Sequence, residues 1–140
     1  MPFDFNQFLT LATALAANPD EASQRTAISR AYYTVFHSAR GRIELTVGTW
    51  EDRKNPARIG RHKDLSSHEW CWKQFRETND TACRQIAAEG DRMKTRRTKA
   101  DYKPADYGNI NAEVQRQLVA AAQLQADLAA LNALYPAPLP

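Results

Sequence analysis

The sequence predicts an all-α fold, an up-and-down bundle of four to five helices that forms one domain over residues 1–140. Glycines are few, five in 140 residues, and alanines are frequent, which favours helix because alanine is the best helix former. Apolar residues recur at intervals of three and four, the period of an amphipathic helix. Val, Ile and Thr nowhere gather in a short alternating run, so no strand is indicated. A chain of this length can bury one core.

The first two helices are expected at about residues 4–17 and 19–46. Asn18 can cap the second helix, and Pro19 suits its first position because that N–H would have no helical partner anyway. Gly48 is expected to end it. The apolar face of the first helix consists of Phe5, Phe8, Leu9, Ala12, Leu15 and Ala16, and that of the second consists of Ile28, Tyr32, Val35, Phe36, Ala39 and Ile43.

A third helix is expected from Ser66, because Ser66 and Glu69 have the spacing of a capping box. The polar residues 78–80 can break this helix or begin a new turn, and Pro104 ends the helical pattern. The inward-facing residues of this region are expected to be Trp72, Phe75, Ala82, Ile86 and Met93.

The last helix is expected at about residues 112–134, with Asn109 or Asn111 as its cap. A short proline-rich tail, 136–140, follows it. Residues 48–65 are polar and interrupted by Asn55-Pro56 and Gly60, which predicts a long exposed loop. Loops of this length are usually functional or disordered.

Two cysteines, Cys71 and Cys83, are too few for a disulfide framework and fit no zinc spacing, so free buried thiols in a reducing cytosol are expected. The N-terminus lacks the pattern of a signal peptide, and no apolar run has the length of a membrane span. These observations predict a cytoplasmic protein without a membrane partner. No His and carboxylate spacing suggests a metal site, and no cofactor is expected.

Basic residues are concentrated near the end of the third helical region. The formal net charge is only +3, but six of the twelve residues from 92 to 103 are Arg or Lys, with Asp101 as the one acid among them. Such a cluster is typical of a phosphate-binding surface. The alternative is a charged helix end, because basic side chains are favoured near a helix C-terminus. The candidate nucleic-acid-binding residues are Arg92, Lys94, Arg96, Arg97, Lys99 and Lys103.

Two segments resemble the signatures of HEPN domains. Ser29–Arg40 reads SRAYYTVFHSAR and is similar to the signature of the family's second helix, with Arg25 four residues earlier at a position that is often arginine. Arg96–Tyr102 reads RRTKADY and resembles the family's arginine-rich turn. The resemblance implies a helical bundle that often dimerises. Many members are metal-independent endoribonucleases of defence or toxin–antitoxin systems, others pair with a small nucleotidyltransferase, and others only bind.

Active members of the family use an arginine followed, after four to six residues, by a histidine. In the arginine-rich segment of this chain, Tyr102 stands where that histidine would be, and tyrosine is a poor base near neutral pH. Arg30 and His37 match the spacing, and seven positions on a helix place them about 20° apart. Arg61 and His68 have the same spacing. The sequence therefore predicts Arg30 and His37 as the pair that would cut RNA, with Arg97 and Tyr102 assisting.

Several of these residues also have a purely structural interpretation. Arg30 and His37 can belong to a solvated or dimer-facing helix surface. Tyr33 can stack on a base or pack in an interface, and Tyr102 and Tyr107 are candidates, by position only, for modification by a nucleotidyltransferase partner. The residues expected in the core are Tyr32, Trp70, Trp72 and Phe75. His62 and His68 are expected to be ordinary surface residues. RNA, a second copy of the chain, and a nucleotidyltransferase or antitoxin are the partners that the sequence suggests.

Overall fold

A computed structural model describes residues 2–47, 66–104, 106–136 and 139–140. The described residues form five helices and no strand: α1 (Asn6–Ala16), α2 (Glu21–Val47), α4 (Ser67–Arg76), α5 (Thr81–Tyr102) and α6 (Ile110–Leu134). The predicted all-α helical bundle is therefore confirmed. The predicted loop at 48–65, including His62, and part of the predicted tail lie outside the described residues.

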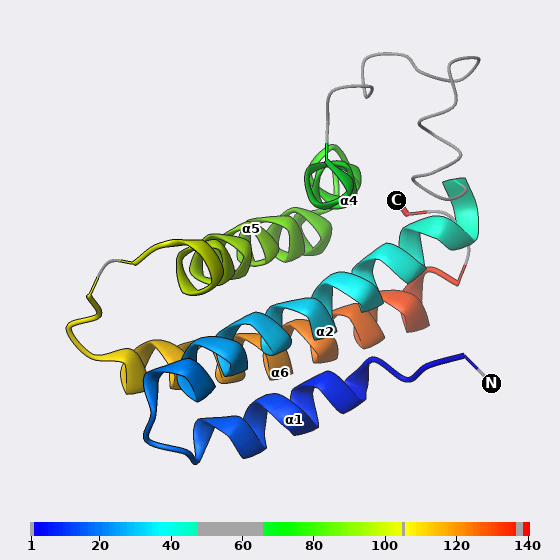
Figure 1. The fold of residues 1–140 in the computed structure, drawn as a ribbon. Coiled ribbons are helices and arrows are strands. Elements are labelled where there is room, and N and C mark those ends of the chain that lie inside the picture. Colours follow the sequence, from blue (N-terminus) through cyan, green and yellow to red (C-terminus); the bar gives the residue numbers. More distant parts are fainter. Residues whose placement is uncertain (1, 48–65, 105, 137–138) are drawn as a thin grey trace.

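The four longer helices run alternately up and down, and α4 crosses them (Figure 1). α1 lies antiparallel beside α2, while α5 and α6 form the other two rods of the bundle. α4 is seen end-on in this view and packs mainly against α5. Because α2 contacts all four other helices, residues on different sides of α2 meet different neighbours.

Polar side chains cap four of the five helices. Ser66 accepts a hydrogen bond from the Glu69 amide at 3.1 Å, so the predicted start of this helix is confirmed. The break before α5 and the start of α6 are also confirmed, since Asp80 and Asn109 cap these helices. The predicted cap of α2 is wrong: the Asp20 carboxylate, not Asn18, accepts from the Ser23 amide, at 2.9 Å.

The reason for this difference lies in the turn between α1 and α2. The side chain of buried Gln24 donates to the backbone carbonyls of Ala16 and Asn18. That contact fixes Asn18 within the turn, two residues before the position from which a side chain can cap α2. The helix consequently begins at Glu21 rather than at Pro19.

The core contains large aromatic side chains from α2 and α4. Tyr32, Trp70, Trp72 and Phe75 are all essentially inaccessible to solvent, which confirms their predicted place in the core. Cys71 and Cys83 are free and buried, as predicted. Across the described part of the chain, none of the helices combines the length and the apolarity needed to cross a membrane.

Gly90 allows α4 to approach α5 closely. A methyl group at this position would lie 2.5 Å from the six-membered ring of buried Trp72. We expect Gly90→Ala to lower the free energy of unfolding by about 1–3 kcal/mol through overpacking, despite the better helix propensity of alanine. Urea denaturation measures the change, with Gly41→Ala as a control because a methyl group there would meet no side chain of the described residues beyond its chain neighbours within 4 Å. An equal or higher stability of Gly90→Ala would contradict this packing.

Candidate functional site

The two segments that resemble family signatures meet in space. Ser29 on α2 donates from its hydroxyl to the Asp101 carboxylate on α5 at 3.0 Å. Arg25 donates to the backbone carbonyls of Lys99, Ala100 and Lys103 at the end of α5, at 2.7 to 3.3 Å. The Arg25 guanidinium thereby satisfies carbonyl groups at the end of α5, where that of Lys99 also accepts from the Lys103 amide. Segments about 70 residues apart in the chain thus form one structural unit.

Arg30 and His37 lie on the side of α2 that faces the N-terminal part of α1. The His37 ring stacks on Phe5 with 3.7 Å between ring centroids, and the Arg30 guanidinium lies 4.7 Å from the ring centroids of both Phe8 and Tyr33. Both residues are half-buried. α1 therefore partly covers the side of α2 that lies opposite the apolar residues of α2.

The surroundings of His37 favour its neutral form. Burial lowers the pKa of His37, and the positive charges of Arg40 and Arg30 lower it further. Neither ring nitrogen of His37 is hydrogen-bonded to another described residue. A neutral imidazole with an available nitrogen can accept a proton near neutral pH.

His68 belongs to the same region, which the sequence did not predict. It lies in the first turn of α4, stacks on Phe36 with 4.1 Å between ring centroids, and its Nδ1 is 2.7 Å from the Tyr32 hydroxyl. The prediction of a plain surface residue is therefore wrong. A signal was present, because His68 precedes Trp72 by one helical turn and shares its inward face.

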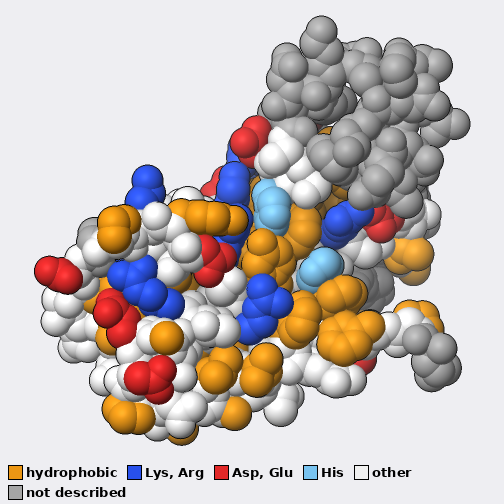
Figure 2. Space-filling model, in the orientation of Figure 1, with side chains coloured by type: hydrophobic (Ala, Val, Ile, Leu, Met, Phe, Trp, Pro, Cys, Tyr) orange, Lys and Arg blue, Asp and Glu red, His pale blue; other side chains and the backbone are white. Residues whose placement is uncertain are grey.

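The two described histidines are visible on one face of the molecule, among hydrophobic and basic side chains (Figure 2). His37 lies 5.4 Å from the Phe36 centroid and 6.1 Å from that of Tyr33, while His68 lies 4.1 Å and 5.8 Å from the same two rings. The two imidazoles thus lie near the same two aromatic rings of α2. We call this surface the histidine face and define it by Arg30, Tyr33, His37, His68 and Lys94.

Arg97 lies behind the histidine face and is buried, with 6% of its surface exposed. Its guanidinium is 3.7 Å from the Asp101 carboxylate and 5.5 Å from the ring centroids of Tyr32 and Tyr33. Its Nε makes no hydrogen bond with a described group. Arg97 was predicted to bind phosphate from an exposed patch, and its burial corrects that prediction.

The other basic residues of the cluster do not form one continuous patch, because they point in different directions around α5. Arg92 pairs with Glu89 at 2.6 Å, and Arg96 contacts Glu89 and the buried amide of Gln117 on α6. Arg92 and Arg96 are thus paired within the protein, and of the six basic residues only Lys99 lies in the last turn of α5. Lys94, Lys99 and Lys103 border a groove of about 610 Å³ along α5, and Lys94 alone of these also belongs to the histidine face.

Tyr102 occupies the last position of α5 and is 71% exposed. Its ring centroid lies 5.8 Å from the guanidinium carbon of Arg97. Tyr102 is thus accessible at the edge of the region that Arg97 supports, whereas Tyr107 is half-buried below the charges of Arg25 and Lys99. Among the described residues, no three His, Cys, Asp or Glu side chains gather closely enough to hold a metal ion.

Burial, followed by the positive charges of Arg97 and Lys94, lowers the pKa of His68 to about 4. His37 and Arg40 on α2 add smaller effects in the same direction, and the Tyr32 hydroxyl faces Nδ1. The unfolded chain, with a histidine pKa near 6.5, binds the proton more readily, so stability falls as the pH is lowered from 6.5 towards 4.

We therefore expect the unfolding temperature of the wild type to fall more steeply than that of His68→Gln between pH 6.5 and about 5. Carboxylates titrate similarly in both proteins, so the difference between the two curves isolates His68. Parallel curves would show that the His68 imidazole is not desolvated.

Comparison with known proteins adds no family name to this geometry. No protein-family model matches the chain, and neither a curated protein nor a solved structure matches it.

Proposed function

We propose that this chain is a HEPN-like, RNA-directed protein that works as a homodimer and cuts RNA without a metal ion, in a defence or toxin–antitoxin system. The contact between the Ser29–Arg40 and Arg96–Tyr102 segments supports the family assignment, because both signature-like segments contribute to one region. The observation that carries the proposed activity is the half-buried His37 imidazole, which stacks on Phe5 and has an available nitrogen near the Arg30 guanidinium; burial and the charges of Arg40 and Arg30 lower its pKa.

In the proposed reaction, His37 takes the proton from a ribose 2′-hydroxyl. The 2′-oxygen then forms a bond to the adjacent phosphorus as the bond from phosphorus to the 5′-oxygen breaks. Water supplies a proton to the leaving 5′-oxygen, and His37 later returns its own proton to solvent. The products are a 2′,3′-cyclic phosphate and a 5′-hydroxyl end. Arg30 stabilises the negative charge that develops on the phosphate oxygens.

Arg97 and Tyr102 assist the proposed reaction in two different ways. Arg97 contributes positive charge from behind the tyrosine rings. Tyr102 offers an exposed phenol at the edge of the region, where it can donate a hydrogen bond or stack on a base.

The test is incubation of the purified protein with total RNA and with tRNA in EDTA. We expect the wild type to produce fragments with 2′,3′-cyclic phosphate ends and the Arg30→Ala, His37→Ala double variant to produce none. Arg116→Ala is a matched control, because this exposed arginine on α6 lies outside the histidine face. Full activity of the double variant would end the assignment of this pair. No cleavage by folded, dimeric wild type would reject the enzymatic proposal.

The second candidate function is a non-catalytic binding module that acts with a nucleotidyltransferase or an antitoxin. Tyr102 favours it, because a tyrosine occupies the position of the family's catalytic histidine and its side chain is 71% exposed. Co-purification of a nucleotidyltransferase, together with absent cleavage in EDTA, is the result that this second function predicts.

A further inference from the structure

His68 is held by a directed chain of hydrogen bonds. Trp72 Nε1 lies 3.0 Å from the Tyr32 hydroxyl oxygen, and that oxygen lies 2.7 Å from His68 Nδ1. An indole nitrogen can only donate, so the Tyr32 oxygen accepts from Trp72. Burial raises the pKa of Tyr32, which keeps its single hydroxyl hydrogen in place. That hydrogen is then donated to His68 Nδ1.

This chain fixes the tautomer of His68. Because Nδ1 accepts a hydrogen bond, the neutral ring carries its own hydrogen on Nε2. Protonation of Nδ1 would place two hydrogens between His68 and Tyr32 and would leave the buried Tyr32 hydroxyl without an acceptor. The position of His68 in the first turn of α4 also disfavours a positive charge, because the positive end of the helix dipole lies there. His68 is therefore a neutral N–H donor near neutral pH.

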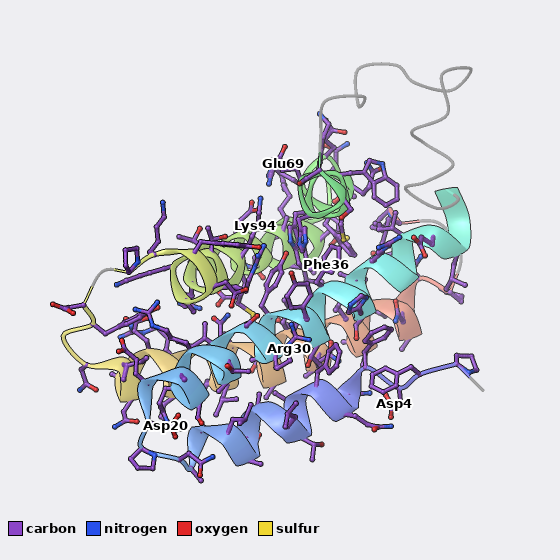
Figure 3. The ribbon with its side chains drawn as sticks, viewed as in Figure 1. Asp4, Asp20, Arg30, Phe36, Glu69 and Lys94 are labelled. Atoms are coloured by element: carbon purple, nitrogen blue, oxygen red, sulfur yellow. The ribbon has the colours of Figure 1, made fainter. Side chains whose placement is uncertain are left out.

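The Nε2 of His68 makes no hydrogen bond with a described residue, and the ring is visible on the surface of the histidine face (Figure 2). Figure 3 shows Phe36 projecting from α2 towards α4 and α5, with Lys94 from α5 on one side and Arg30 on the other. Lys94 is half-buried and makes no ion pair with a described residue. Buried Arg97 adds charge, and its partner Asp101 is shared with Ser29.

We propose that His68 is the neutral hydrogen-bond donor of a phosphodiester-binding site, in which Nε2–H donates to a non-bridging phosphate oxygen beside Lys94. The inference deepens the proposed function and rests on it: the phosphate is the one next to the ribose that His37 would deprotonate. The two imidazoles can share one nucleotide step because both lie against the Phe36 ring. The neutral His68 ring donates a hydrogen bond to the phosphate and carries no extra proton that it would have to release. Lys94 and Arg97 supply the positive charge.

A phosphodiester suits this site better than a carboxylate. Arg30 and Lys94 approach from two helices, with the charge of buried Arg97 behind them, and a tetrahedral phosphate presents oxygens in several directions whereas a carboxylate presents two in one plane. The Arg30 guanidinium lies 4.7 Å from the ring centroid of half-buried Tyr33, and a guanidinium plane is a surface on which the adjoining base can stack. The ligand class is thus a short single-stranded nucleotide segment.

The first test observes His68 directly by ¹⁵N NMR of histidine-labelled protein. At pH 7 we expect the signals of a neutral ring with hydrogen on Nε2, and in Tyr32→Phe a mixture of tautomers, since the phenyl ring retains the packing but donates no hydrogen bond. A doubly protonated ring, or hydrogen on Nδ1, would overturn the proposal.

The second test adds a 2′-deoxy dinucleotide, which contains the phosphodiester but cannot be cut. We expect the Nε2–H resonance to shift on titration. We expect His68→Phe, which keeps the ring stacking, to bind about 10- to 100-fold more weakly, the loss typical of one hydrogen bond to a charged group. His68→Gln, whose amide can donate, should recover part of this affinity. Unchanged affinity in His68→Phe would overturn the proposal.

These measurements separate the failure of the inference from that of the proposed function. If the dinucleotide shifts Nε2–H but the wild type does not cut RNA, the phosphodiester site stands and the ribonuclease proposal fails. If the wild type cuts RNA in EDTA but His68→Phe binds and cuts equally well, the ribonuclease stands and the role of His68 is rejected.

Discussion

Replacing His37 with asparagine will lower the rate of RNA cleavage by about 10²- to 10⁴-fold, the range that a general base typically contributes. Asparagine retains hydrogen-bonding groups on a short side chain but cannot accept the proton of a 2′-hydroxyl. The fold should persist, because His37 is only half-buried and makes no hydrogen bond with a described residue. Cleavage of a fluorescent RNA oligonucleotide under single-turnover conditions measures the rate, and circular dichroism checks the fold.

The pH dependence of cleavage gives an independent check on His37. A base must be deprotonated to act, so kcat/KM should rise with pH up to the pKa of His37 and then reach a plateau. Burial lowers that pKa below 6.5, so the plateau should already be present at neutral pH. Phe5→Ala removes the ring that stacks on His37, and the rising limb should therefore move to higher pH. A profile without this limb, or a limb unaffected by Phe5→Ala, would contradict the role of His37.

Replacing Trp72 with alanine will lower the free energy of unfolding by about 3–5 kcal/mol, as for other buried tryptophans. The indole is completely inaccessible to solvent, and its truncation would leave a cavity against Gly90. The Tyr32 hydroxyl would also lose a hydrogen-bond donor in the core. Equilibrium urea unfolding followed by far-UV circular dichroism measures the loss.

Trp72→Phe separates the two causes. Phenylalanine retains part of the packing but cannot donate to Tyr32, so we expect a smaller loss of stability together with a changed ¹⁵N signal of His68. Trp70→Phe provides a matched control, because Trp70 is equally buried. A loss below about 1 kcal/mol for Trp72→Ala would show that the α4 and α5 contact is not a tightly packed part of the core.

The helices and their ends depended mostly on local chemistry, which the sequence displays. Ser66 and Asn109 cap helices because their side chains reach amides only three residues away, and the repeat of apolar residues in α2 predicts burial of Ile28 and Tyr32 from that helix alone. The prediction of Asn18 as the cap was wrong because Gln24 of α2 contacts the turn after α1, and this contact competes with capping by Asn18. The contact forms only because the two helices lie close together.

The candidate site depended on which helix covers which face. Periodicity placed Arg30 and His37 on one side of α2, but only the packing of α1 brought Phe5 and Phe8 over them. Likewise, six basic residues in twelve indicate a charged segment without indicating which side chains α2 and α6 will cover. Arg97 is buried whereas Lys94 is half-buried at the histidine face, although the two lie only three positions apart on α5.

His68 shows most clearly which properties follow from the local sequence and which follow from the tertiary structure. The sequence by itself determined a capped helix with His68 and Trp72 on a common face, one turn apart. Only the tertiary structure brought Tyr32 from α2 to the Nδ1 of His68, and Arg97 and Lys94 from α5 near its ring. The physical reason is that capping and periodicity act over three or four residues of one helix. The tautomer and pKa of an imidazole depend on the atoms nearest to it in space, whatever their separation along the chain.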